Sequence, residues 1–377
     1  MDGRELQPDI METNPDNCNF IQNNNNNNFN HGPEFKRKRK KKMFYKDKEK
    51  QKQSLVTSGT QFIRVFQKQL QNAKASKEET LHYMQRVLHS IFFFGHINHP
   101  QIKPEEFIPT DKLETYKRVF QNSFKEYNTH FPRQAPYSIL LEYMTKVNNT
   151  GNPESLMEKL VELNKSLRTL NEEGEQVVAN YFDFSASVVT QSYIKDPNNA
   201  NILECFYGAS LSCKGETQRK IMIYISALYV WDKAISYVVS CGDTGHGIVF
   251  PEDVHCKAYR FTTEINGYKE IPPCVKCHKM FITNFDPEYE VVKKLQPWRY
   301  GNCAETESLS KLLQGSLEVR NHLHTFGDNR QPMSREDIEK TFTAKHEGSM
   351  REKLANCLAS RDFRVAPCDW KFFTPGT

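Results

Sequence analysis

Apolar residues in the first half of the folded chain recur at the spacing of a helix. Phe62, Val65, Phe66 and Leu70 are separated by one to four positions, which places them on one face of a helix. Prolines lie between several of the apolar stretches. Since proline removes a backbone donor and breaks a helix, these stretches should form separate helices. The pattern predicts a mainly α-helical region over residues 54–200, with further apolar stripes over 81–91, 116–127, 137–147 and 156–170.

The pattern changes after about residue 200. Ile202–Cys213 and Cys256–Ile265 have the composition of strands, and Ile221–Trp231 and Ala234–Cys241 are rich in Ile, Val and Tyr. The last two runs fit a β-hairpin, and a buried helix over 217–240 fits them as well, because periodicity does not separate the two for short apolar runs. We therefore expect an α/β domain in the second half of the chain.

The N-terminal segment differs from both regions in composition. Residues 1–53 contain a polyasparagine run and few apolar residues, so they cannot bury enough surface to offset the entropy cost of ordering, and we expect disorder. The net charge is −5 over residues 1–35 and +9 over residues 36–53. Only about +1 of the total charge of +5 then belongs to residues 54–377, which argues against a generally basic nucleic-acid-binding body.

Seven consecutive basic residues stand within that segment. Such a run is typical of a nuclear-import signal and suits loose contact with phosphates, and a solvated charge run with no targeting role is the alternative. The residues are Lys36, Arg37, Lys38, Arg39, Lys40, Lys41 and Lys42.

Three regions result: a disordered basic tail over 1–53, a helical region over 54–200 and an α/β domain over 201–377. The longest apolar run, Ile221–Trp231, has 11 residues, whereas a membrane-spanning helix needs about 20. The charged N-terminus leads into no apolar stretch, so no secretory signal is indicated. We expect a protein of the nucleus, the cytoplasm or both, with no membrane partner.

The cysteines concentrate in the second half of the chain. Cys18 lies in the tail, none occurs over 19–204, and nine follow from Cys205 onward. In a reducing compartment they should be thiols or metal ligands rather than disulfides.

A first chemical motif is Pro273-Cys274-Val275-Lys276-Cys277-His278. Proline favours the start of a helix, and the helix N-terminus favours the thiolate that a metal requires. A single Cys-x-x-Cys motif supplies two ligands, and a zinc ion needs two more to complete its coordination. The same letters also fit a redox pair or, with His278, a haem-attachment string.

A second motif is Asn302-Cys303-Ala304-Glu305. Asn302 can cap a helix, and Glu305 then occupies the third helical position of a capping-box-like start. A helix start alone is enough to explain this motif.

Together, the two motifs resemble those of the cytidine-deaminase-like superfamily, particularly branches with Cys-Ala-Glu in place of His-Ala-Glu. The resemblance implies that Cys274, Cys277 and Cys303 bind zinc. It also implies that Glu305, which is not a ligand, shuttles protons as a general acid and base while a nucleobase loses ammonia. The substrate would be a free nucleoside or a base within nucleic acid.

The order of the motifs is reversed relative to the family. Here the Cys-x-x-Cys turn precedes Cys303 by 25 intervening residues, so a circularly permuted fold would be needed. His255 is the only earlier candidate for the family's histidine, but Lys257, not Glu, stands two residues later. His255 could instead act as a fourth ligand and close a structural zinc site.

Two alternatives to a deaminase therefore remain at this point. One is a nuclear adaptor whose helical region binds a protein partner and whose cysteines hold structural zinc; the other lacks a metal. Trp298, Tyr300 and Trp370 are candidate stacking surfaces for a base. Neither the base nor the oligomeric state follows from the sequence.

Overall fold

The computed structural model describes residues 33–73, 75–147, 153–167, 184–198, 201–213, 215–262, 265–291, 296–326 and 332–376. The chain divides into a unit over Met1–Tyr45 and a compact unit over Lys46–Thr377, which contains every site discussed below. None of the helices in the described part of the chain combines the length and apolar character that a membrane crossing requires.

The first helix, α1, begins earlier than the sequence pattern suggested. It spans Pro33–Asn72, so it includes residues 33–53, which the composition assigned to the tail. The reason is that residues 34–58 contain neither glycine nor proline and many Lys, Arg, Gln and Glu, which are good helix formers. The basic run Lys36–Lys42 falls in this helix, and its import role stays a prediction. The polyasparagine run lies outside the described residues.

The helical region follows the predicted stripes. The side chain of Ser76 accepts a hydrogen bond from the Glu79 N–H at 3.1 Å, as a cap at the start of α2 requires. The stripe expected over 116–127 is divided at Phe120 into two short helices. The helices are α2 (Lys77–His96), α3 (Pro104–Phe107), α4 (Leu113–Val119), α5 (Gln121–Glu126), α6 (Pro136–Val147) and α7 (Pro153–Leu167).

The main sheet has the order β3-β2-β5-β6, with antiparallel neighbours, and β8 pairs with β5 in parallel. Strands β3 and β5 confirm the two strands expected from the sequence. Strand β2 was missed, because it lies within the region predicted to be helical. The strands are β2 (Val188–Lys195), β3 (Ile202–Ala209), β5 (Val254–Thr262), β6 (Gly267–Ile271) and β8 (Asn284–Asp286).

Of the two alternatives for the apolar runs after residue 220, the helical one is confirmed and the hairpin is wrong. The two apolar runs form successive helices, α8 (Glu216–Tyr229) and α9 (Lys233–Cys241), and the Asp232 carboxylate accepts a hydrogen bond from the Ala234 N–H at 2.9 Å. These runs are buried on nearly all sides, which removes the polar stripe that would mark a helix. The later helical segments are α10 (Val275–Met280), α11 (Ala304–Gly315), α12 (Leu317–His322), α13 (Arg335–Thr341), a π-helical segment (Phe342–Glu347), α14 (Gly348–Ala359) and a 3₁₀ turn (Pro367–Asp369).

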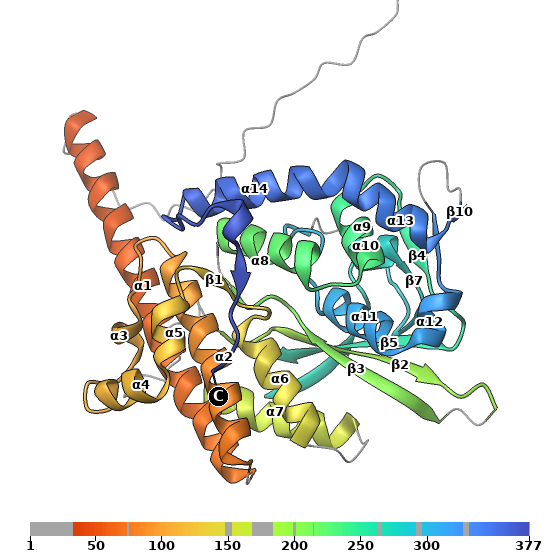
Figure 1. Ribbon diagram of the computed structural model, residues 1–377, viewed down its shortest axis with the longest axis horizontal. Coiled ribbons are helices and arrows are strands. Elements are labelled where there is room, and N and C mark those ends of the chain that lie inside the picture. Colours follow the sequence, from red (N-terminus) through yellow and green to blue (C-terminus); the bar gives the residue numbers. More distant parts are fainter. Residues whose placement is uncertain are drawn as a thin grey trace, which may run out of the picture. The chain divides into compact units, whose positions relative to one another are not determined.

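Two smaller sheets complete the unit. One has the order β10-β9-β4-β7, and the other pairs β1 with β11 in parallel, which joins the helical region to the end of the chain. Their strands are β1 (His130–Phe131), β4 (Gly247–Val249), β7 (Phe281–Ile282), β9 (His324–Phe326), β10 (Pro332–Met333) and β11 (Lys371–Phe372). Helices α2–α7 lie together on one side, and the main sheet with α8–α14 lies on the other (Figure 1). The structure thus combines a helical N-terminal region with a mixed helix and sheet C-terminal region.

Candidate metal centre and its cavity

Two helices begin at cysteines. Cys274 is the N-cap of α10, and its sulfur accepts from the Cys277 N–H at 3.5 Å. Cys303 is the N-cap of α11 and makes no side-chain capping bond, so its sulfur is available to a ligand. The expectation that Asn302 caps this helix is wrong, and Glu305 is the second helical residue rather than the third.

The three cysteines of the two motifs converge. The sulfurs of Cys274, Cys277 and Cys303 all lie within 4.8 Å of one another, and those of Cys274 and Cys303 are 3.5 Å apart. Thiolates bound to one tetrahedral ion with bonds near 2.3 Å should be separated by about 3.8 Å. The donor set therefore fits a metal ion, and no fourth histidine, cysteine or carboxylate among the described residues belongs to the group.

The thiols affect one another's ionisation. Hydrogen bonds from Cys277 and Cys303 lower the pKa of Cys274, whereas the interaction with Cys274 raises the pKa values of Cys277 and Cys303. One sulfur therefore takes the negative charge at the expense of the other two. A cation at the centre of the group would favour the thiolate at all three.

Contacts with the main sheet fix the start of α11. A Cβ added to Gly208 of β3 would come within 2.4 Å of the Ala304 carbonyl oxygen, so glycine is needed for this close approach. The hydroxyls of Ser192 and Ser308 lie 2.8 Å apart, and the Leu211 N–H donates to the Asn302 carbonyl at 3.1 Å. The sheet thus positions both Cys303 and Glu305.

Glu305 lies beside the sulfurs with only 4% of its surface exposed. Burial, followed by repulsion from Cys274, raises the pKa of its carboxyl to about 7, and Arg260 offsets part of this shift. Cys256 on β5 is also close, since the charge of Glu305 contributes to the raised pKa of that thiol. A carboxyl with a pKa near neutrality can both accept and donate a proton.

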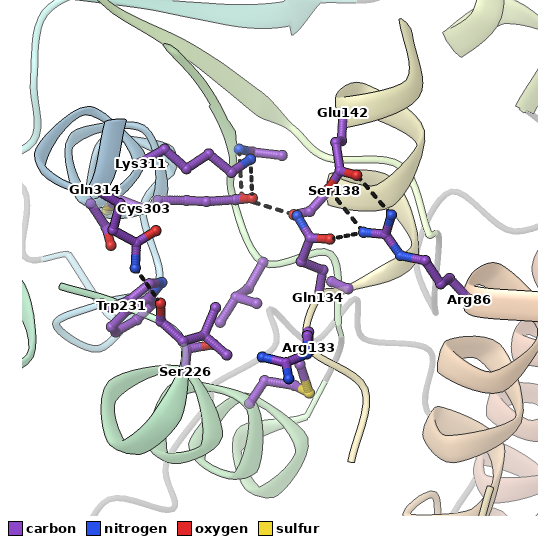
Figure 2. Close-up of a pocket in the computed structure, with 18 residues that line it drawn as sticks. Arg86, Arg133, Gln134, Ser138, Glu142, Ser226, Trp231, Cys303, Lys311 and Gln314 are labelled. Atoms are coloured by element: carbon purple, nitrogen blue, oxygen red, sulfur yellow. Dashed lines mark hydrogen bonds and ion pairs between the residues drawn. The ribbon is translucent and has the colours of Figure 1, made fainter. Parts of the chain in front are cut away.

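Glu307 points away from the sulfurs. Its carboxylate accepts from Ser138 at 2.8 Å and from the Ala209 N–H at 3.0 Å, and it pairs with Lys311 at 2.7 Å. It lines a second cavity of about 320 Å³, where Lys311 of α11 faces Ser138 of the helical region (Figure 2). Glu307 is therefore a structural link between the two regions.

His255 does not join the metal group. Residues of β5 alternate between the faces of the sheet: Cys256 points toward α11, and its side chain lies 3.5 Å from the Ser192 hydroxyl. His255 points to the opposite face, where its ring stacks on Tyr193 with centroids 5.3 Å apart. The expectation of His255 as a fourth ligand is wrong for this reason.

A cavity of about 430 Å³ opens next to the sulfurs and Glu305. Val188, Ile271 and the two prolines before Cys274 supply apolar walls. Two residues of its lining carry a buried side-chain oxygen that makes no hydrogen bond within the described part of the molecule: Gln296 (Oε1) and Asn302 (Oδ1). The Trp298 indole, also on the lining, is close enough to the Cys274 sulfur to favour its thiolate. Partnerless polar atoms in a cavity are where a polar ligand would bind.

Several of these residues have no signal in the sequence. Gln296 and Arg260 stand in no motif, and Asn302 suggested only a cap. Of the three aromatic candidates for stacking, Trp298 lines the cavity, and Tyr300, two residues later in the chain, does not. Trp370 is elsewhere, packed on Phe131 with ring centroids 5.4 Å apart.

Comparison of the chain with protein-family models, with curated proteins and with solved structures finds no match in any of the three.

Proposed function

We propose that this protein is a zinc-dependent hydrolytic deaminase that acts on a nucleobase. The observation that carries the proposal is the convergence of Cys274, Cys277 and Cys303 beside a buried Glu305, next to a cavity that Cys274, Cys303 and Glu305 line. The group lacks a fourth protein ligand among the described residues, which leaves a coordination position for water, as in catalytic zinc sites.

Zinc held by the three thiolates would lower the pKa of a water molecule to about 7 and so supply the nucleophile near neutral pH. Glu305 takes the proton from the attacking water and delivers it to the departing amino group. The water oxygen adds to the amidine carbon of the base, and the second water proton ends on the ring nitrogen; the carbon–nitrogen bond breaks, and ammonia leaves as the carbonyl forms.

The remaining cavity residues orient the base. The side-chain oxygens of Gln296 and Asn302 can accept hydrogen bonds from ring or amino N–H groups. The apolar walls cover the ring faces and exclude bulk water. Because a ligand with N–H groups would pair with these oxygens and an apolar ligand would not, they favour a polar heterocycle over an apolar ligand.

The test uses the full chain purified without chelators. Bound metal is measured, and ammonia release is screened on cytosine and adenine compounds, as free nucleosides and within single strands. Glu305→Gln should keep its zinc and lose about 10²–10⁴-fold in turnover, because the proton shuttle is removed.

Glu318→Gln, the same change at an exposed position on α12, is the matched control and should keep full activity. Loss of zinc in Glu305→Gln would identify Glu305 as a ligand and contradict the proposed role. A metal-loaded protein that deaminates none of these substrates would favour the structural alternative, in which the site stabilises an adaptor.

A further inference from the structure

A cleft of about 470 Å³, distinct from the cavity that Glu307 lines, adjoins the cavity of the metal centre. Trp298 lines both, so the two hollows meet at this side chain. The cleft is formed by residues of α8, α9, α10 and α14 and by the loop before α11. Its charged residues are Arg219, Lys220, Lys276, Arg299, Lys353 and Glu216.

The charge of this cleft is strongly positive. Five bases face one acid, although residues 54–377 carry only about +1 in total. Glu216 is shared between Arg299 at 2.5 Å and Lys220 at 3.1 Å, so it neutralises at most one of them. A local excess of positive charge raises the electrostatic potential in the cleft and attracts an anion there.

Two of the basic groups also shape the cleft. Lys276 donates to the carbonyl oxygens of Gln296 and Trp298, and its ammonium lies 5.3 Å from the ring centroid of Tyr300. Arg219 donates from Nε to the Cys213 carbonyl at 3.0 Å. These bonds hold the loop that carries Trp298 and the positive groups in fixed positions.

Aromatic rings are interleaved with the charges. Tyr224, Trp298 and Tyr300 line the cleft together with the bases. Basic groups that follow a phosphate backbone, alternating with rings on which bases stack, are the features that bind single-stranded nucleic acid. A free nucleoside has no phosphate and would leave these charges unused.

We propose that this basic cleft binds the phosphates and a flanking base of a single-stranded nucleic acid whose target base enters the cavity at the metal centre. This inference rests on the proposed function, because it names the substrate class of the same site. A single strand is required because a base paired within a duplex cannot reach a buried cavity without being extruded.

The test measures binding in full-length Glu305→Gln protein, so that the ligand is not consumed. The probe is a fluorescent single strand of about 12 nucleotides with one cytosine or one adenine, titrated between about 50 and 200 mM salt. The double variant Lys220→Glu and Lys353→Glu should bind at least about 10-fold more weakly. Its dependence of log affinity on log salt should be shallower by about 1.4, since each lost phosphate contact removes about 0.7 for a single strand.

The matched control reverses two exposed lysines of the helical region, Lys112 and Lys125, in the same background. Both double variants keep the basic segment over 36–52, so its contribution to binding cancels. Equal binding by the cleft variant and the control would overturn the proposal, and so would equal competition by cytidine or adenosine monophosphate, which would indicate a mononucleotide site.

The two proposals fail separately. If wild type deaminates nucleosides and the cleft variant binds the strand normally, the inference is wrong and the deaminase proposal stands. If no substrate releases ammonia but strand binding depends on Lys220 and Lys353, the cleft is a nucleic-acid site and the deaminase proposal is wrong.

Discussion

Glu305 and Glu307 leave the first turn of α11 on different sides and enter different surroundings. Glu307 is held by Ser138, the Ala209 N–H and Lys311, which together join α6, β3 and α11. Glu305 is buried next to three thiols at the wall of a cavity, and its pKa is raised to about 7. The Glu307 carboxylate is therefore held by partners within the protein, whereas the Glu305 carboxyl can gain or lose a proton near neutral pH.

This difference separates stability from function within one helix. A carboxylate surrounded by donors and a cation stabilises the fold in its ionised form. Burial raises the pKa of a carboxyl group, so ionising that group at neutral pH lowers the stability of the fold. Groups with such perturbed pKa values are typical of functional sites. The two sides of α11 should therefore respond oppositely to substitution.

The largest effect is expected at the sulfurs. Cys303→Ser removes one of the three proposed ligands, so zinc affinity should fall by more than about 100-fold, because even residues that only orient ligands cost 10–100-fold. Metal analysis after dialysis should find about one zinc per chain in wild type and almost none in the variant.

Cys357→Ser is the matched control, since Cys357 lies on α14 outside the group. A Cys303→Ser protein that retains stoichiometric zinc would show that the three sulfurs are not a metal site.

The next effect compares the two glutamates by stability. Glu307→Ala should lower the free energy of unfolding by about 3 kcal/mol, because it leaves buried donors and Lys311 without their acceptor. Glu305→Ala in metal-free protein at pH 8 should not lower it, because a buried carboxylate is removed from an unfavourable setting. Chemical denaturation of both variants measures the difference. Equal destabilisation by the two substitutions would show that Glu305 and Glu307 do not differ in their contribution to stability.

The smallest effect is a pH dependence. The folded-state pKa of Glu305, about 7, is above its ordinary value of 4.5, so the unfolded chain releases this proton first as the pH rises. Between pH 5 and 7.5, the metal-free protein should lose about 2 kcal/mol of unfolding free energy from this group.

Glu305→Gln should remove that part of the pH dependence, while Glu307→Gln should leave it in place. Denaturation curves at several pH values with a chelator present test this. An identical pH dependence in wild type and Glu305→Gln would show that Glu305 is not buried as described.

The helices and the site motifs differ in how far local sequence predicts them. Stripes such as 81–91 and 137–147 and the Ser76 cap gave correct helices. The apolar runs of α8 and α9 are short and rich in Ile, Val and Tyr, so their pattern fitted a hairpin equally well. Strand β2 was missed, and α1 began 20 residues before the boundary expected at residue 53.

The sequence by itself determined that two helices would begin close to Cys274 and Cys303, with the second cap misplaced by one residue at Asn302, and that Glu305 would stand in the first turn of the second. Proline, N-cap and helix-former preferences act over a few residues, so they can be inferred from order alone. Only the tertiary structure decided that the three sulfurs meet, that His255 faces away, and that Glu305 rather than Glu307 borders the cavity. It also decided that Lys220, Lys276 and Lys353 share a cleft beside that cavity. Such arrangements depend on burial and on contacts between distant segments, which packing sets and local order does not encode.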